Sequence, residues 1–260
     1  MCWLVVIGIV GSPRKNGITN RLVESALDGS RSKDVETKKV YLVDYDVKQF
    51  RGTGGAAEAN KYCPEELSRL CEEADAIVLG APVYWGDING LTKDFMDTVR
   101  ISNPRGKPAL GVAIAGGSGK GLLSGVQSIY QFFFHKQMKG IDPTPVSRFN
   151  LEESVGALRI SGARLADLAK RKQAFGKIGD EYWPEVSADY ASLTYLKCDH
   201  VDEFMMLAEQ LVKTSKLDKV RDAKAELKKA KTLLAEGKRG EAARCAVRSY
   251  QMLYYASPSQ

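Results

Sequence analysis

Apolar side chains in the first 180 residues gather in short runs, and the first of these is the clearest. Residues 3–10 are continuously apolar, rich in β-branched side chains and followed by Gly11-Ser12-Pro13. Such a run is typical of a strand buried on both faces of a parallel sheet. The other runs predict strands at residues 35–43, 76–82, 109–115 and 155–160.

Between these runs the apolar positions follow helical spacing. Apolar stripes that predict five helices begin at Leu22, Leu67, Leu91, Leu122 and Leu165. Pro64 stands at the favourable first position of the second helix. Strands that alternate with helices predict right-handed crossovers, so we expect an α/β fold with a doubly wound parallel sheet. In such sheets ligands bind beyond the carboxyl ends of the strands.

The chain changes character towards its end, where only helical patterns occur. Amphipathic stretches predict helices near 201–212, 217–234 and 242–253, with Gly237 and Gly240 separating the last two. These two resemble one tetratricopeptide hairpin, but about three repeats are needed for a stable array. We therefore divide the chain into a domain at 1–180 and a helical extension at 181–260, which we expect to pack against the body or a second subunit.

Charge follows the same division. Residues 213–248 contain 12 Lys and Arg against 5 Asp and Glu, whereas the rest of the chain has 26 against 27. This basic segment is either a solvated helical face or a docking surface for an anionic partner.

Composition excludes several classes of protein. The longest apolar run, residues 2–10, is far shorter than the roughly 20 residues of a membrane-spanning helix. Five scattered cysteines without a Cys-x-x-Cys pair, and two histidines, favour neither a disulfide framework nor a metal site. We expect a cytoplasmic protein with no membrane span and no bound metal.

The loop after the first strand, residues 11–20, has the composition of a phosphate-binding loop. It combines two glycines and short polar side chains with Arg14, and it precedes a helix N-terminus. The alternative is that Thr19 or Asn20 only caps the helix. The loop lacks the dinucleotide fingerprint G-x-G-x-x-G, and Ile114 and Gly121 rule out a nucleotide-hydrolase loop around Gly119-Lys120.

Two further loops follow strand ends. Tyr84 and Trp85 stand in a turn between Pro82 and Gly86, where they can hold a planar ligand, although two buried core aromatics are the alternative. The third loop, Gly116-Gly117-Ser118-Gly119, is either a simple turn or a flexible backbone lip over the same ligand.

Taken in order, residues 11–20 and the stretch Ala81 to Gly86 followed by Lys93 to Asp97 resemble the NADPH-dependent FMN reductase family. More narrowly, they are similar to its iron–sulfur flavoprotein branch. The resemblance covers about residues 1–175. It implies a flavodoxin-like fold, a five-stranded sheet in the order 2-1-3-4-5 and bound FMN. The implied FMN contacts are Ser12, Arg14, Asn16, Gly17, Thr19, Asn20, Pro82, Val83, Tyr84, Trp85, Gly86, Gly116, Gly117, Ser118 and Gly119.

The implied activity is transfer of hydride from NADPH or NADH to FMN and of electrons onward to a quinone, flavin, azo compound, metal ion, oxygen or protein. FMN carries this chemistry, so no catalytic side chain is expected. The family resemblance and the amphipathic extension favour a homodimer or tetramer. The alternatives are a flavodoxin-like electron carrier, and a binding module whose basic helices dock an anionic partner.

The sequence departs from the iron–sulfur branch in its cysteines. That branch has four cysteines before the third strand, whereas residues 51–71 contain only Cys63 and Cys71. Four thiolates normally hold such a cluster, so we predict none. Cys63 is either a redox thiol beside a flexible loop or, like Cys71, a small core residue.

Overall fold

The central sheet forms from the apolar runs that the sequence shows. The computed structural model describes residues 4–52, 61–171 and 182–256, so most of the Gly/Ala loop at 51–60 lies outside the described residues. The strands are β1 (Val5–Val10), β2 (Glu36–Tyr41), β3 (Ala76–Tyr84), β4 (Asp87–Ile88), β5 (Pro108–Ala115), β6 (Lys139–Gly140) and β7 (Val146–Ser147). The sheet order is β2-β1-β3-β5-β6, and β7 also pairs with β5. Among the described strands only β4 is antiparallel to its neighbour. The expected 2-1-3-4-5 order is confirmed, with β6 and β7 together in the fifth position.

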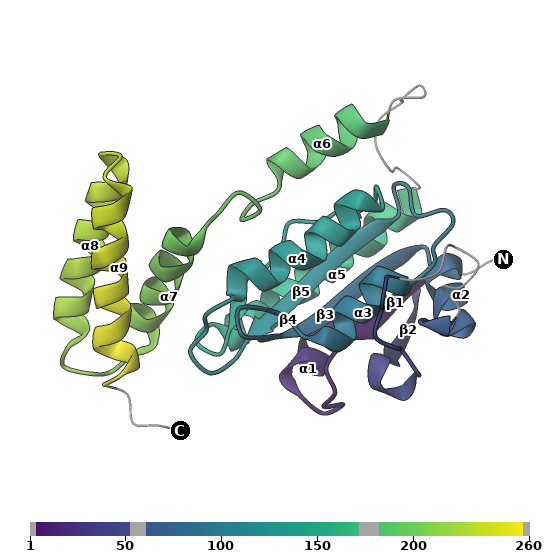
Figure 1. The fold of residues 1–260 in the computed structure, drawn as a ribbon, viewed down its shortest axis with the longest axis horizontal. Coiled ribbons are helices and arrows are strands. Elements are labelled where there is room, and N and C mark those ends of the chain that lie inside the picture. Colours follow the sequence, from purple (N-terminus) through teal and green to yellow (C-terminus); the bar gives the residue numbers. More distant parts are fainter. Residues whose placement is uncertain (1–3, 53–60, 172–181, 257–260) are drawn as a thin grey trace.

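Helices cover both faces of the sheet (Figure 1). One face carries α1 (Ile18–Arg31) and α5 (Leu151–Arg171), and the other carries α2 (Glu65–Glu73), α3 (Gly90–Thr98) and α4 (Leu122–His135). Alternate side chains of each central strand enter opposite layers: Val6 and Val78 pack under α1, whereas Ile7 and Ile77 pack under the other helices. This alternation follows from the pleat of a strand.

The expected strand at 155–160 is wrong, because these residues lie inside α5. The buried side chains of that helix recur every three or four residues, and Ile160 is exposed. The helix packs very closely on α1. A Cβ added at Gly162 would come within 1.8 Å of the Ala26 carbonyl oxygen, and the Ser30 hydroxyl donates to the Gly162 carbonyl at 2.9 Å. The close approach therefore depends on glycine.

The extension contains α6 (Tyr182–Ser192), α7 (His200–Thr214), α8 (Val220–Ala235) and α9 (Arg239–Tyr254). Helix α6, which the sequence pattern did not predict, lies beside α4, where the Tyr190 hydroxyl donates to the Met138 carbonyl at 2.9 Å. Gly237, with φ +76°, stands in the α8–α9 turn, but Gly240 lies inside α9 and separates nothing.

Helices α7–α9 share one apolar core, which also includes Ala115, Leu122 and Leu123 of the sheet domain. Their packing against the body is therefore confirmed for this part of the extension. None of the helices in the described ranges combines the length and the apolar character that a membrane crossing requires.

Candidate functional site

A cavity of about 860 Å³ opens at the carboxyl ends of β1, β3 and β5. Its lining consists of Ser12, Arg14, Gly17, Ile18, Thr19, Pro82, Val83, Tyr84, Trp85, Gly86, Ile114, Gly116, Gly117, Ser118 and Lys120. The tertiary structure thus brings the three loops together at one edge, as the parallel topology requires. Among the residues predicted from the sequence, only Asn16, Asn20 and Gly119 do not line the cavity.

The end of the cavity formed by the first loop is suited to an anion. Helix α1 begins after Gly17, has no side-chain cap and carries no acidic residue in its first turn. Its first N–H groups therefore lack partners within the helix and carry partial positive charge. The Arg14 side chain forms no ion pair within the described residues and lines the same cavity. Neither Thr19 nor Asn20 is the helix cap, so capping does not account for this loop.

The turn of this loop is held by Ser12, which is 4% exposed. Its hydroxyl oxygen accepts a hydrogen bond from the Arg14 backbone N–H at 3.1 Å, and the Gly17 N–H donates to the Arg14 carbonyl at 3.1 Å. These bonds place the Arg14 side chain beside the start of α1.

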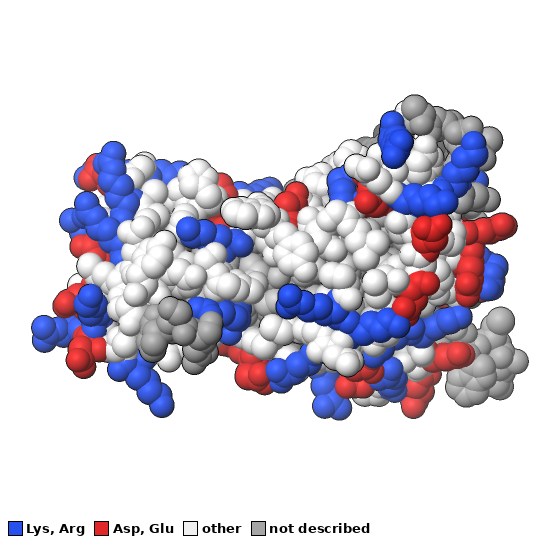
Figure 2. Space-filling view, turned by 60° about the horizontal axis from the view of Figure 1, so that its bottom comes forward, with Lys and Arg blue, Asp and Glu red and all other residues white. Residues whose placement is uncertain are grey.

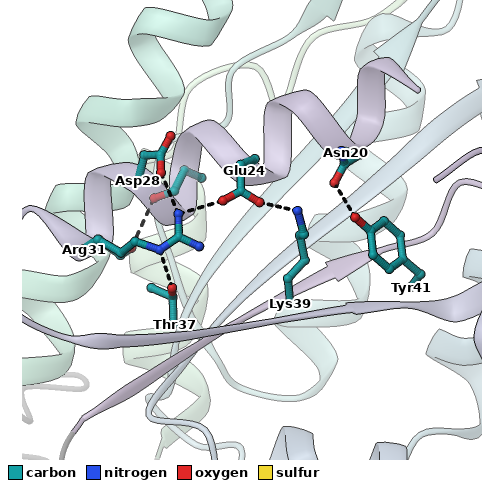
Figure 3. Close-up of polar contacts among 9 residues, drawn as sticks. Asn20, Glu24, Asp28, Arg31, Thr37, Lys39 and Tyr41 are labelled. Atoms are coloured by element: carbon teal, nitrogen blue, oxygen red, sulfur yellow. Dashed lines mark hydrogen bonds and ion pairs between the residues drawn. The ribbon is translucent and has the colours of Figure 1, made fainter. Parts of the chain in front are cut away.

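Asn20 points towards Tyr41 of β2 (Figure 3). Its side-chain oxygen accepts a hydrogen bond from the Tyr41 hydroxyl at 3.0 Å. Glu24, one turn later on the same face, accepts hydrogen bonds from Lys39 and Arg31. Burial opposes ionisation of Glu24, but these two cations outweigh it and lower the carboxyl pKa. Asn20 thus belongs to the contact between α1 and β2, and Asn16 is an exposed loop residue.

The end of β3 presents two aromatic side chains to solvent instead of to the core. Trp85 is fully exposed, and Tyr84 is half exposed. Trp85 has φ +55° and Gly86 has φ +89°, a conformation that costs a non-glycine residue on the order of 1 kcal/mol. The Ser124 hydroxyl bonds to the Gly86 carbonyl and holds this turn. Strain of this kind concentrates at ligand sites. The exposure of Tyr84 and Trp85 also excludes the alternative that both rings are packed in the core.

The third loop has two sides. A Cβ added at Gly116 or Gly117 would meet no protein atom within 4 Å, so both glycines leave open space at the cavity. A Cβ at Gly119 would lie 2.6 Å from a Leu207 methyl group of α7. Gly116 and Gly117 therefore face the ligand side, whereas Gly119 allows the extension to pack closely.

Three residues of the cavity escaped the sequence analysis: Ile18, Ile114 and Lys120. Lys120 was detectable, because it directly follows a Gly-rich loop at the end of a predicted strand. Its Nζ lies 5.8 Å from the Phe204 ring centre and 5.9 Å from that of Tyr250, so helices α7 and α9 position it.

Cys71 lies on the buried face of α2 and Cys63 lies just before that helix, and both side chains are part of the core. Burial raises the pKa of both thiols, that of Cys71 to about 12, which disfavours the reactive thiolate. The described residues contain no group of three or more His, Cys, Asp or Glu side chains placed to hold a metal ion. The absence of an iron–sulfur cluster stays a prediction from the sequence.

Known proteins resemble this chain in the region that builds the cavity. Residues 4–146 match the model of the NADPH-dependent FMN reductase family. An iron–sulfur flavoprotein of Methanocaldococcus jannaschii is 34% identical over 151 residues, which are 54% of this chain and 78% of that protein. An FMN-dependent NADPH-azoreductase of Staphylococcus aureus is 28% identical over 118 residues, or 45% of this chain and 61% of that protein.

The fold has solved counterparts as well. The apo form of an NADH:FMN oxidoreductase superimposes with a TM-score of 0.51 at 22% identity, covering 63% of this chain and 88% of that one. The family match ends at residue 146, so the helices α7–α9 that support the third loop lie beyond it.

Proposed function

Because this chain belongs to the NADPH-dependent FMN reductase family and is an FMN-dependent NAD(P)H oxidoreductase, we propose that the cavity at the sheet edge is where FMN binds. The observation that carries the proposal is the arrangement of the lining. One loop provides Arg14, which forms no ion pair with any described residue, and a helix N-terminus without a side-chain cap. The other loops provide exposed aromatic rings and glycines beside open space. This donor set fits a phosphate joined to a planar ring system.

The residues divide the work as follows. Arg14, the hydroxyls of Ser12 and Thr19 and the first N–H groups of α1 would bind the phosphate. Asn20 would have to leave Tyr41 to take part, so the phosphate site does not depend on it. Residues 82–86 and 116–118 would hold the ring.

When bound, FMN would supply the redox chemistry, which is hydride transfer from a reduced nicotinamide and transfer of two electrons to an acceptor. The described lining contains no Asp, Glu, His or Cys. The side chains of the lining would therefore bind FMN, orient it and shield it from solvent, and none of them is required as an acid or base. The acceptor is proposed to be a small molecule, such as a quinone, flavin, azo compound or metal ion, or a protein.

The test is the visible absorption of the purified protein titrated with FMN and then, without oxygen, with NADPH or NADH. We expect saturable flavin binding and bleaching by the nicotinamide, with recovery when an acceptor is added. Bound flavin that is reduced by neither NADPH nor NADH would favour the electron carrier. No flavin binding would overturn the site.

We also propose that residues 1–180 form the FMN domain, that 181–260 are an extension and that the chain acts in the cytoplasm as a homodimer or tetramer. Sedimentation equilibrium tests the assembly.

A groove of about 610 Å³ between α7 and α8 has an apolar floor surrounded by five cations, Lys213, Arg221, Lys224, Lys228 and Lys231. Lys213 and Lys231 already pair with Glu153 and Glu209. An anionic partner docked there should dissociate steeply with added salt.

A further inference from the structure

The extension contributes directly to the wall of the cavity. Lys120 lines the cavity, and its ammonium group lies over the rings of Phe204 on α7 and Tyr250 on α9. The Tyr250 hydroxyl donates to the carbonyl of Ser118, another lining residue, at 2.9 Å. Helices outside the family match therefore support the third loop from behind.

Ring contacts continue from Tyr250 to Tyr254 and Phe149. Tyr254 stacks on Tyr250, with ring centres 5.1 Å apart and planes at 12°. The guanidinium of Arg148 lies 5.8 Å from the Tyr254 ring centre and 4.9 Å from that of Phe149. We call the five residues Lys120, Arg148, Phe204, Tyr250 and Tyr254 the ledge.

The ledge is positively charged and free to bind an anion. Neither Lys120 nor Arg148 has an ion-pair partner within the described residues, and both side chains are exposed. Glu203, a buried acid on α7, accepts hydrogen bonds from the N–H groups of Gly121 and Leu123. Aromatic rings beneath a cation hold it in place and leave its N–H donors available. Figure 2 shows uncharged surface running from the basic lobe formed by α7–α9, at the left, onto the sheet domain.

We infer that the ledge binds the adenosine-phosphate half of the nicotinamide dinucleotide, whose nicotinamide end reaches into the adjoining cavity. This inference rests on the proposed function. The two cations match phosphate groups. The rings of Phe204 and Tyr254, which are partly exposed, match a purine ring, whereas Tyr250 is buried and supports them from below. Because Lys120 belongs to both the ledge and the cavity, a ligand on the ledge can extend into the cavity where FMN is proposed to bind. Since NADPH carries one more phosphate than NADH, the ledge favours NADPH.

The test uses Arg148→Met, because Arg148 does not line the cavity. We expect the KM for NADPH to rise about tenfold or more, the loss of one charge-assisted contact, with a smaller rise for NADH. The affinity for FMN and kcat at saturating NADPH should stay as in the wild type. Adenosine 2′,5′-bisphosphate, which has no nicotinamide, should bind to the FMN-loaded wild type and about tenfold more weakly to the variant by calorimetry.

Arg244→Met is the matched control, because Arg244 is an exposed cation on α9 and the described residues show no contact between it and the ledge. It should leave all five quantities unchanged. Wild-type KM and bisphosphate affinity in Arg148→Met, or an equal loss in Arg244→Met, would overturn the ledge. Failure of NADPH to reduce the flavin would instead contradict the proposed function, and the bisphosphate titration would still decide the ledge.

Discussion

The carboxylate of Glu203 accepts a hydrogen bond from the backbone N–H of Gly121 at 3.0 Å, across 82 residues of sequence. Its other oxygen accepts from the Leu123 N–H at 3.1 Å. Helix α4 has Gly121 as its N-cap, with no side-chain cap of its own, so a residue of α7 caps it. This bond joins the extension to the loop that walls the cavity.

Replacing Glu203 by Ala should destabilise the protein by about 2 kcal/mol, because two buried N–H groups lose a charged acceptor. FMN affinity should fall with it, since residues 116–121 lose their support. Chemical denaturation and FMN titration measure the two effects. Glu209→Ala, which removes an exposed ion pair on the same helix, should have little effect on either. Equal stability of both variants would show that the cap is unimportant.

Arg14→Ala should weaken FMN binding by about 1.5–3 kcal/mol, the range for a hydrogen bond to a charged group. Fluorescence quenching of FMN gives the affinity. The matched control is Arg21→Ala on α1, the helix that follows this loop, because Arg21 pairs with Glu152 and does not line the cavity. Unchanged affinity in Arg14→Ala would place the phosphate elsewhere.

Trp85→Gly should change stability and binding in opposite directions. Removing a side chain from φ +55° relieves about 1 kcal/mol of strain, so the Tm of the FMN-free protein should rise. FMN binding should weaken, because the exposed ring is lost. Asp34→Gly, at φ +52° in an exposed turn, should raise the Tm without affecting FMN. A Trp85→Gly variant that binds FMN normally would remove Trp85 from the site.

Acid should loosen the helical extension through Asp199. Hydrogen bonds from Arg239 and from the N–H groups of α7 lower the pKa of this carboxyl to about 2, from the usual 3.8. A lowered pKa in the folded state means that Asp199 stabilises the protein above pH 4, and that this contribution fades as the pH falls towards 2. The size of the effect is reduced by solvent, because the pair is about half exposed.

Acid unfolding followed by circular dichroism should therefore differ between the wild type and Asp199→Asn. The variant should be less stable at pH 7, and the difference should shrink as the pH approaches 2. A constant difference across this range would exclude titration of Asp199 as the cause.

The sequence by itself determined the sheet and the edge where the site lies. Residues 5–10 are apolar without interruption, so both faces of that strand must be buried, and parallel strands then place their following loops at one edge. Local chemistry also predicted Arg14, Trp85 and Gly116 as residues at this edge, and all three line the cavity. A charge, an aromatic ring and a missing side chain are properties of the residue type and do not depend on the fold.

Tertiary structure decided what short patterns leave ambiguous. Residues 155–160 are apolar enough for a strand, but close packing of α5 on α1 makes them helical. The fifth position in the sheet is filled by β6 and β7, two strands of two residues each, which are too short to produce a recognisable sequence pattern. Asn20 contacts Tyr41 because its position along α1 places its side chain on the side of the helix that faces β2. Lys120 lines the cavity and Gly119 does not, which is the reverse of what the sequence predicts. The reason is that helices more than 80 residues later in the chain pack against this loop. Contacts at such separation depend on how whole elements dock, which no local pattern encodes.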